Sequence, residues 1–237
     1  MDLRRSWDIF NAMRQEQQAP EAAYSLIAQD TVDLLGRHMV ISGASMIDVG
    51  GGPGYTAEAL RNAGAHAFTV DADSEELKLH GRSPVAAVIG DGQVLPIGND
   101  ALDAVVTLNA LEHVVDPWEF MGELVRVVRP GGIAFIGVTN WLSPWGGHET
   151  SPWHYFGGER AARRYKQRHG VEAKNRYGES LYPVHIASIM RWARNCAEVT
   201  VVDAFPRYYP SWASWIVKVP GLREIATWNL ALVLEKR

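Results

Sequence analysis

The sequence predicts an α/β protein built on a doubly wound, mostly parallel sheet, and three observations lead to that expectation. Short apolar runs alternate with helical patterns from residue 45 to about residue 138. A glycine cluster, residues 50–54, directly follows the first apolar run. Near the C-terminus the alternation ends in two strand-like runs, which an antiparallel pair explains better than another strand–helix–strand unit.

Two helices are expected ahead of the sheet, over residues 3–18 and 21–38, with Pro20 separating them. The predicted strands of the parallel part cover residues 45–49, 67–71, 85–89, 102–108 and 133–138. Helices over residues 55–63, 75–80 and 118–128 connect them. Right-handed crossovers then place helices on both faces of the sheet.

The second half of the chain departs from this alternation. Residues 141–180 are rich in tryptophan, glycine, histidine and arginine and contain no expected strand. A helix over residues 184–197 precedes strands over 199–204 and 230–234, which we expect to close the sheet as an antiparallel hairpin. We expect one domain over residues 1–237. Its parts are the N-terminal helices (1–40), the core (44–140), an insertion (141–182) and the closing helix and hairpin (183–237).

The composition limits the kinds of protein that fit. The chain has 237 residues, of which 47% are hydrophobic and 21% charged, as expected of a globular domain. Its net charge of −4 argues against a nucleic-acid partner, and its one cysteine excludes an internal disulfide. The N-terminus lacks the apolar core of a signal peptide, and no uncharged run approaches the roughly 18 residues that cross a bilayer. We therefore expect a cytoplasmic protein.

The glycine cluster predicts a ligand site at the end of the first strand. That strand carries Asp48 near its end and runs into Gly50, Gly52 and Gly54 before a helix begins. Glycine lets the backbone turn sharply and lets a ligand approach without interference from Cβ atoms. The helix amino end offers free N–H groups beside that ligand. The alternative is a glycine-rich turn that binds nothing.

Two further acids favour a ligand that contains a nucleoside. Asp71 closes the second strand, 23 positions after Asp48, and is suited to bind the two hydroxyls of a ribose. Asp91 follows the third strand, where an adenine edge would lie. Asp73 is an alternative to Asp71 but is more simply explained as the cap of the next helix. Asp48, Asp71 and Asp91 all fall at the carboxyl ends of predicted strands, where open α/β sheets bind ligands.

The ordered motifs resemble those of class I S-adenosylmethionine-dependent methyltransferases of the type 11 kind. The similar segments are residues 47–54 (first motif), 90–97 (adenine segment), 102–106 with 111–114 (fourth-strand block) and 126–132 (turn before the fifth strand). The resemblance covers about residues 44–140. It implies a Rossmann-like sheet of seven strands with the final hairpin, and S-adenosylmethionine as cofactor. One departure is Gly92, where the family often has alanine or another small side chain.

The resemblance also implies roles for single residues. Asp48, Gly50, Gly51, Gly52 and Gly54 would hold the methionine end of the cofactor, Asp71 with Ala72 the ribose, and Asp91 with Gly92 the adenine. Asn109 and His113 would lie close to the cofactor as well. A narrower resemblance rests on residues 146–149, 154–158 and 205–208. They are similar to an actinobacterial group of methyltransferases associated with export of cell-envelope mycolate glycolipids, which implies a glycolipid-like acceptor.

The segment after the fifth strand should face the transferred methyl group. A hydroxyl acceptor benefits from a base, and His148, oriented by Glu149, is the first candidate to take its proton. His154 is the next candidate. The alternative is that His148 and Glu149 only pin the loop by hydrogen bonds. As a metal pair they lack an evident third ligand, so no metal is expected. A carboxyl acceptor is equally compatible with the sequence, and the acceptor is either a small molecule or an amphiphile.

Two late segments predict weak peripheral contact with a membrane, because cationic attraction and apolar insertion together suffice for such contact. The basic residues are Arg160, Arg163, Arg164, Lys166, Arg168, Lys174 and Arg176. The aromatic segment covers residues 208–217. The simpler alternatives are a solvated helix face and the core of a lid. The oligomeric state cannot be read from the sequence.

Two other functions were weighed. A nicotinamide-dependent oxidoreductase requires a Gly-x-Gly-x-x-Gly fingerprint, but Tyr55 occupies the position of its third glycine. A non-catalytic S-adenosylmethionine-binding sensor or partner protein fits the glycine cluster. It leaves the aromatic, histidine-bearing loop without a purpose.

Overall fold

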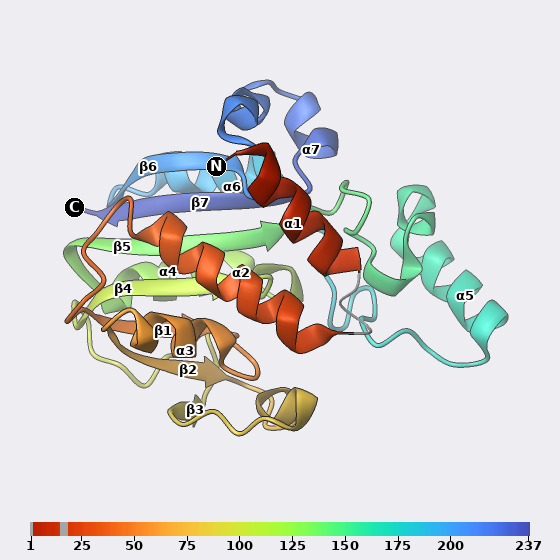
Figure 1. Ribbon diagram of the computed structural model, residues 1–237. Coiled ribbons are helices and arrows are strands. Elements are labelled where there is room, and N and C mark those ends of the chain that lie inside the picture. Colours follow the sequence, from red (N-terminus) through yellow and green to blue (C-terminus); the bar gives the residue numbers. More distant parts are fainter. Residues whose placement is uncertain (1, 15–18) are drawn as a thin grey trace.

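The computed structural model describes residues 2–14 and 19–237, which fold around one seven-stranded sheet (Figure 1). The strands are β1 (Ser45–Val49), β2 (His66–Asp71), β3 (Ala87–Ile89), β4 (Leu102–Leu108), β5 (Val128–Thr139), β6 (Val199–Pro206) and β7 (Asn229–Lys236). Their spatial order is β3-β2-β1-β4-β5-β7-β6. Strands β1 to β5 pair in parallel, and β7 runs antiparallel to both β5 and β6. The predicted doubly wound sheet with an antiparallel end is confirmed.

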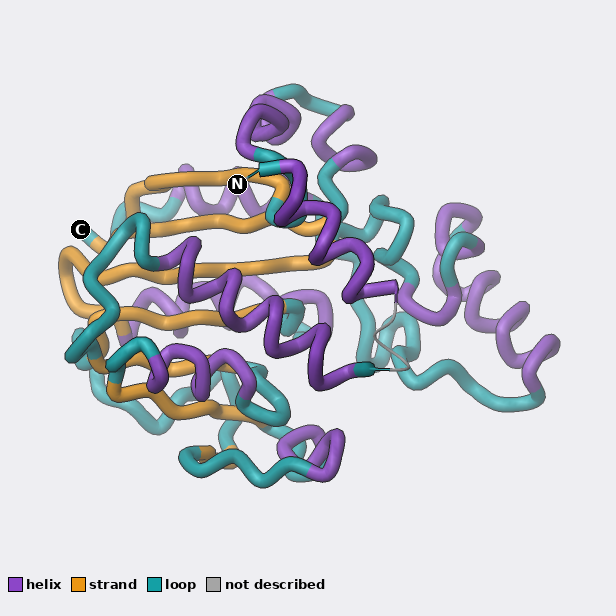
Figure 2. The backbone as a smooth tube through the Cα atoms, viewed as in Figure 1, coloured by secondary structure: helices purple, strands orange, loops and turns teal. Residues whose placement is uncertain are grey.

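Helices cover both faces of this sheet (Figures 1 and 2). The helices α1 (Leu3–Arg14), α2 (Pro20–Leu35) and α3 (Tyr55–Asn62) lie on one face, and α4 (Pro117–Val127) and α6 (Ile186–Asn195) lie on the other. Successive side chains of β5 point to opposite faces of the sheet. Phe135 packs against the core on the α2 side, and Ile136 packs against the core on the α4 side. Burial on both faces explains why these strands read as continuous apolar runs.

Several element boundaries differ from the expectations. The second helix ends at Leu35 rather than residue 38. The expected helix over 75–80 is a 3-10 turn, η1 (Glu76–Gly81), which breaks where His80 has a φ of 59°. The third strand begins only at Ala87, behind Pro84, and its three residues are exposed at the sheet edge. Residues 15–18 of the first predicted helix lie outside the described residues.

The segment between β5 and α6 projects from the end of the sheet where β4 and β5 finish (Figure 1). It contains the short helices η3 (His148–Thr150) and η4 (Trp153–Phe156), followed by α5 (Gly158–His169). It adds no strand to the sheet, as predicted. The connection from β6 to β7 contains η5 (Ser211–Lys218) and α7 (Leu222–Ala226), so the closing strands pair as expected but are not joined by a tight turn.

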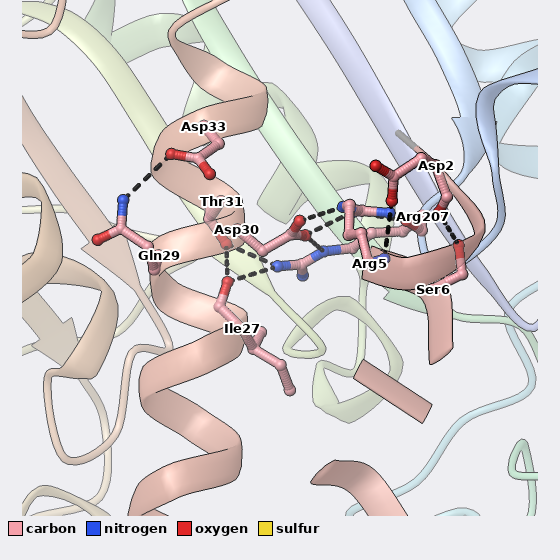
Figure 3. Close-up of polar contacts among 9 residues, drawn as sticks. All are labelled: Asp2, Arg5, Ser6, Ile27, Gln29, Asp30, Thr31, Asp33 and Arg207. Carbon is pink, nitrogen blue, oxygen red and sulfur yellow. Dashed lines mark hydrogen bonds and ion pairs between the residues drawn. The ribbon is translucent and has the colours of Figure 1, made fainter. Parts of the chain in front are cut away.

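Arg207, directly after β6, fastens the N-terminal helices to the sheet (Figure 3). Its side chain is fully buried, and its Nη2 donates to Thr31 Oγ1 at 2.6 Å. Asp30 on α2 lies 3.9 Å from Arg207 Nε and forms an ion pair with Arg5 of α1. Arg5 Nη2 also donates to the Arg207 carbonyl at 3.0 Å. Three segments far apart in the sequence thus share one buried ionic network.

Over the residues that the structure describes, no helix is both long enough and apolar enough to cross a bilayer.

Candidate active site

The residues predicted to bind a ligand meet at the carboxyl edge of the sheet. The strand register sets Val49 beside Val70, and Asp71 beside Ile89. Leu108, at the end of β4, lies beside Gly137 of β5. The loops that begin at Gly50, Ala72, Gly90 and Asn109 therefore leave neighbouring strands at one edge. This is the position that the sequence predicted for the candidate cofactor residues.

The glycine loop after β1 passes close to its neighbours. Gly50 has a φ of 70°, and a Cβ atom there would lie 2.5 Å from the Cβ of Ala110. Any other residue would be strained by its backbone conformation and would displace the start of the loop after β4. The loop leads through Gly54, which also has a positive φ, into the buried start of α3.

Asp48 is buried beneath this loop, and neither of its carboxylate oxygens has a hydrogen-bond partner. Burial raises the pKa of Asp48 to about 7, and the negative charge of Asp71 adds to the shift. Weak contacts with the Ala57 N–H and the Thr56 side chain, which fall short of full hydrogen bonds, oppose the shift together with the charge of Arg207. A buried carboxylate without a partner is unfavourable, so this arrangement suits a ligand that brings a cationic donor.

Asp71 is held at the end of β2 by two backbone amides. Its Oδ2 accepts from Gly52 N–H at 2.9 Å, and its Oδ1 accepts from Asp73 N–H at 2.9 Å. The Asp73 side chain instead accepts from Glu75 N–H at 2.8 Å and so closes the turn before η1, whose N-cap is Glu75 rather than the predicted Asp73. Ala72 is exposed between the two acids.

The loop after β3 explains the glycine at position 92. Asp91 is exposed, and its Oδ1 accepts from Gln93 N–H at 2.8 Å. A Cβ atom on Gly92 would overlap the ring of Phe120, which begins the buried face of α4, and would lie 2.9 Å from Val49 Cγ1. The phenylalanine ring therefore leaves no room for a side chain at position 92.

We therefore expect Gly92→Ala to destabilise the fold by about 1–3 kcal/mol through overpacking against Phe120. Unfolding in denaturant measures the loss. Gly98→Ala is the matched control, because a Cβ atom there meets nothing within 4 Å and its φ is ordinary. Phe120→Leu in the Gly92→Ala background should recover part of the loss. Equal stability of the two alanine variants would contradict this packing argument.

Glu112, His113 and His148 converge beside the ends of β4 and β5, and we call them the histidine–glutamate cluster. One ligand-type atom from each lies within 4.8 Å of the others. Glu112 is buried, its Oε1 accepts from Thr139 N–H at 3.1 Å, and its Oε2 has no partner. The rings of His113 and His148 are 5.0 Å apart between centroids.

The sequence predictions did not include Glu112. The signal was available, because Glu112 stands beside His113 in the fourth-strand block, at the start of η2 (Leu111–His113). Burial raises its pKa, and His113 partly offsets that shift. The pKa of His148 is lowered to about 4, first by burial and then by the charges of His113, His154 and Lys174. His148 is therefore a neutral ring near pH 7, and its Nε2 is buried without a partner.

The other two predicted catalytic residues lie differently. Glu149 is exposed and accepts from the Asn175 amide at 3.0 Å, while that same amide nitrogen lies 3.4 Å from His148 Nδ1. Within the described residues no hydrogen bond joins Glu149 to His148 directly. His154 is buried, with Nε2 3.1 Å from the Ser143 carbonyl and Nδ1 3.3 Å from Ser151 Oγ. Both of its ring nitrogens are engaged within the loop, which favours an anchoring role.

Asn109 lies in the left-handed region, with a φ of 55°. Its Oδ1 accepts from Asn229 Nδ2 at 2.7 Å and from Thr139 Oγ1 at 3.2 Å. The side chain thus ties the ends of β4, β5 and β7 together. Its backbone leads into the loop that carries Ala110 against Gly50 and then reaches the histidine–glutamate cluster.

Comparison with known proteins gives a consistent result. Residues 47–136 match a family described as a methyltransferase domain. The chain is 44% identical over 250 residues to a protein of Mycobacteroides abscessus named uncharacterized methyltransferase, with 99% of this chain and 95% of that protein covered. A protein of Mycobacterium marinum with the same name is 42% identical over 245 residues, with 99% and 95% covered.

Two solved structures share the fold. One is an S-adenosylmethionine-dependent methyltransferase from Mesorhizobium loti, with a TM-score of 0.59, 15% identity, and 88% of this chain and 98% of that chain covered. The other is a TehB-like S-adenosylmethionine-dependent methyltransferase from Corynebacterium glutamicum, with a TM-score of 0.58, 16% identity and both chains covered fully, at 100%.

Proposed function

The chain belongs to the methyltransferase family, and we propose that it moves a methyl group from S-adenosylmethionine to a hydroxyl or carboxyl oxygen of a small or amphiphilic acceptor. The proposal rests on one observation: two sites of different chemistry lie near each other at the same edge of the sheet. Asp48 offers an unpaired buried carboxylate beside the glycine loop, and His148 offers an unpaired buried ring nitrogen beyond the ends of β4 and β5.

The residues of the first site fit the donor. The unpartnered oxygens of Asp48 suit the ammonium group of its methionine end, and the glycine loop leaves room for close approach. Asp71, at the end of β2, suits the ribose hydroxyls, and the loop at Asp91 and Gly92 suits the adenine. S-adenosylmethionine, when bound, supplies a methyl group on a sulfonium centre that is already a good electrophile, so orientation of the acceptor provides much of the rate.

Asp71→Ala should weaken S-adenosylmethionine binding by about 100-fold or more, because each of two hydrogen bonds to a charged group contributes a net of about 1.5–3 kcal/mol. Isothermal titration calorimetry measures the change. Asp73→Ala is the control, since its side chain serves the local turn. Binding of NADH at this site, with no response to S-adenosylmethionine or S-adenosylhomocysteine, would overturn the donor assignment.

The acceptor oxygen approaches the histidine–glutamate cluster. A carboxylate acceptor attacks without losing a proton, whereas a hydroxyl acceptor must release one as its oxygen is methylated. The His148 Nε2 has no partner in this position, and it can take that proton in the tautomer that carries its own proton on Nδ1, which gives up the 3.4 Å contact with the Asn175 amide nitrogen. The low pKa of His148 makes the ring a weak base, so the transfer must accompany methylation rather than precede it. The Nδ1 of His113 lies 2.6 Å from the Ser180 carbonyl oxygen, and this hydrogen bond fixes the His113 ring beside His148.

Exposed apolar side chains support an amphiphilic acceptor. Trp7 on α1, Trp212 in η5 and Ile225 on α7 are 62%, 67% and 63% exposed. The Phe10 ring of α1 lies 6.4 Å from Trp228, just beyond α7, so these elements form one corner of the molecule (Figure 1). Within the aromatic segment Ile216 and Val217 are buried, as the core of a lid would be, while Trp212 is exposed and free to contact an apolar partner.

The basic residues of α5 supply a cationic surface. Arg160, Arg163 and Arg168 are exposed and form no ion pair within the described residues. The remaining members are engaged: Lys166 with Glu172, Lys174 with Glu76, Arg176 with Glu179, and Arg164 over the Trp153 ring at 3.8 Å. We propose that these unpaired arginines of α5 attract the enzyme to anionic lipid, where an acylated or glycolipid-like acceptor resides.

Transfer of labelled methyl tests the proposal. Full-length protein, labelled S-adenosylmethionine and either a lipid extract or an aqueous extract of mycobacterial cells are incubated together. We expect label in the lipid fraction with the wild type and far less with His148→Ala. Label only in the aqueous fraction would contradict the amphiphilic acceptor. Label in neither fraction, from protein that binds the cofactor, would support the non-catalytic sensor and sink the proposed activity.

Sedimentation with vesicles tests the lipid contact separately. Wild-type protein should bind vesicles of anionic lipid at low salt and be released as salt rises, since the Debye length shortens. Arg163→Glu should weaken binding several-fold, given about 1 kcal/mol for each basic residue at such a surface. Arg37→Glu, an equal charge change at the exposed end of α2, should leave binding unchanged. Absence of wild-type binding at every lipid composition would contradict the contact.

A further inference from the structure

We propose that Glu112, His113 and His148 form a binding site for a divalent transition-metal ion of the zinc type. No metal is expected from the sequence, because His148 and Glu149 alone lack a third ligand. The fold supplies two others from a distant segment. Their three ligand-type atoms lie within 4.8 Å of one another, and a bound tetrahedral ion would draw them slightly closer, to about 3.4 Å.

Two of the three side chains have buried polar atoms that form no hydrogen bond. Glu112 is 2% exposed, and its Oε2 has no partner although Oε1 is bound to Thr139 N–H. His148 Nε2 is likewise buried without a partner. Leaving such atoms unpaired costs free energy, and native structures satisfy nearly all of them. One ion between the side chains would satisfy both.

The three side chains are also anchored close to one another by contacts with the surrounding structure. His113 Nδ1 lies 2.6 Å from the Ser180 carbonyl, which holds the proton on Nδ1 and leaves a lone pair on Nε2. This is the arrangement by which metal-ligating histidines are usually fixed. Glu112 is anchored by Thr139, and His148 is held in the left-handed region with a φ of 48° by a loop that turns back toward His113.

The donor set selects the ion. Two imidazoles and one carboxylate suit zinc and neighbouring divalent ions rather than calcium or magnesium, which prefer oxygen ligands only. Three protein ligands leave a fourth position open, as in catalytic rather than structural zinc sites. Glu149 is not part of the set, because its carboxylate is exposed and bound to Asn175.

The role of the ion rests on the proposed function, although its binding does not. At the open position the ion would hold the acceptor oxygen and lower the pKa of a hydroxyl. The O–H bond then breaks with its proton passing to solvent, and the oxygen bonds to the methyl carbon as the carbon–sulfur bond breaks. His148 in this case is a ligand of the ion rather than the proton acceptor.

Metal content of tag-free, full-length protein tests the site. After incubation with zinc chloride and desalting, we expect about one zinc ion to stay with each wild-type chain. His148→Ala and His113→Ala should each lower zinc affinity by at least about tenfold. Cobalt in place of zinc should give the visible absorption bands of a four- or five-coordinate site. The matched control is His169→Ala, an exposed histidine at the end of α5, which should keep the zinc.

Cofactor calorimetry shows whether each variant is folded, which matters most for buried Glu112. Full zinc retention by folded His148→Ala, or no retained zinc and no cobalt bands in the wild type, overturns the ion site. Methyl transfer by zinc-free protein, unaffected by a chelator, overturns its catalytic role. Zinc retention without any methyl transfer would instead count against the proposed function and leave the ion site intact.

Discussion

Loss of the His148 side chain is expected to lower methyl transfer by roughly 100- to 10,000-fold, the usual contribution of a positioned acid or base. The half-buried, neutral ring stands beside Glu112 and His113, at the proposed approach of the acceptor oxygen, and its Nε2 has no partner. Either as proton acceptor or as ligand, the ring acts on the acceptor and not on the donor. S-adenosylmethionine affinity should therefore change little.

Comparison of turnover with cofactor affinity separates this role from a structural one. His154→Ala is the informative neighbour, because His154 lies in the same loop with both ring nitrogens bound. It should lower the melting temperature, and its effect on turnover should follow from that loss. Added imidazole should recover part of the activity of His148→Ala but none of that lost in His154→Ala. Turnover near the wild-type value in His148→Ala would mean that His148 only holds the loop in place.

The donor half of the site could be predicted from the sequence because its determinants are local. Asp48, the glycine cluster and the start of α3 are consecutive, and each must have its residue type for the chain to turn there. The parallel strands were likewise recognisable, because burial on both faces makes them continuous apolar runs. Asp71 and Asp91 followed from their places at the ends of such runs.

The acceptor half could not be predicted in the same way, because it is assembled from distant segments. Glu112 and His113 follow β4, His148 lies in η3, and Ser180 comes after α5. No local pattern states that these residues meet. Spacing alone paired His148 with its neighbour Glu149, whereas in the fold Glu149 turns outward to Asn175. The Phe120 ring that excludes a side chain at Gly92 is a tertiary contact of the same kind.

The burial of Arg207 is a second feature that could not be predicted from the sequence. Arginine side chains are mostly exposed, yet that of Arg207 is fully buried beneath α2. Its charge is compensated by Asp30, 177 positions earlier in the sequence, and Asp30 also holds Arg5 (Figure 3). A network that joins both ends of the chain carries no sequence signature, although it decides where α1 and α2 lie.

Asp30→Ala should cost about 3–5 kcal/mol of folding free energy, because it leaves the buried charge of Arg207 without compensation. Arg207 Nε and Nη1 already lack hydrogen-bond partners, so no neighbouring group replaces the lost carboxylate. Denaturant unfolding measures the loss. Asp33→Ala, on the same helix, is the matched control, because Asp33 is exposed and, among the described residues, its side chain bonds only to Gln29, at 3.1 Å (Figure 3). That control should stay within about 0.5 kcal/mol of the wild type.

A double-mutant cycle shows whether the loss belongs to the network. Arg5→Ala removes the outer partner of Asp30, and its effect should not add to that of Asp30→Ala, because both changes break the same ion pair. A coupling of about 0.5–3 kcal/mol between the two changes is expected. Simple additivity, or a loss in Asp30→Ala no greater than in Asp33→Ala, would mean that apolar packing alone holds α1 and α2. In that case, placement of these helices over the sheet would depend on contacts such as Phe10 with Trp228 rather than on charge.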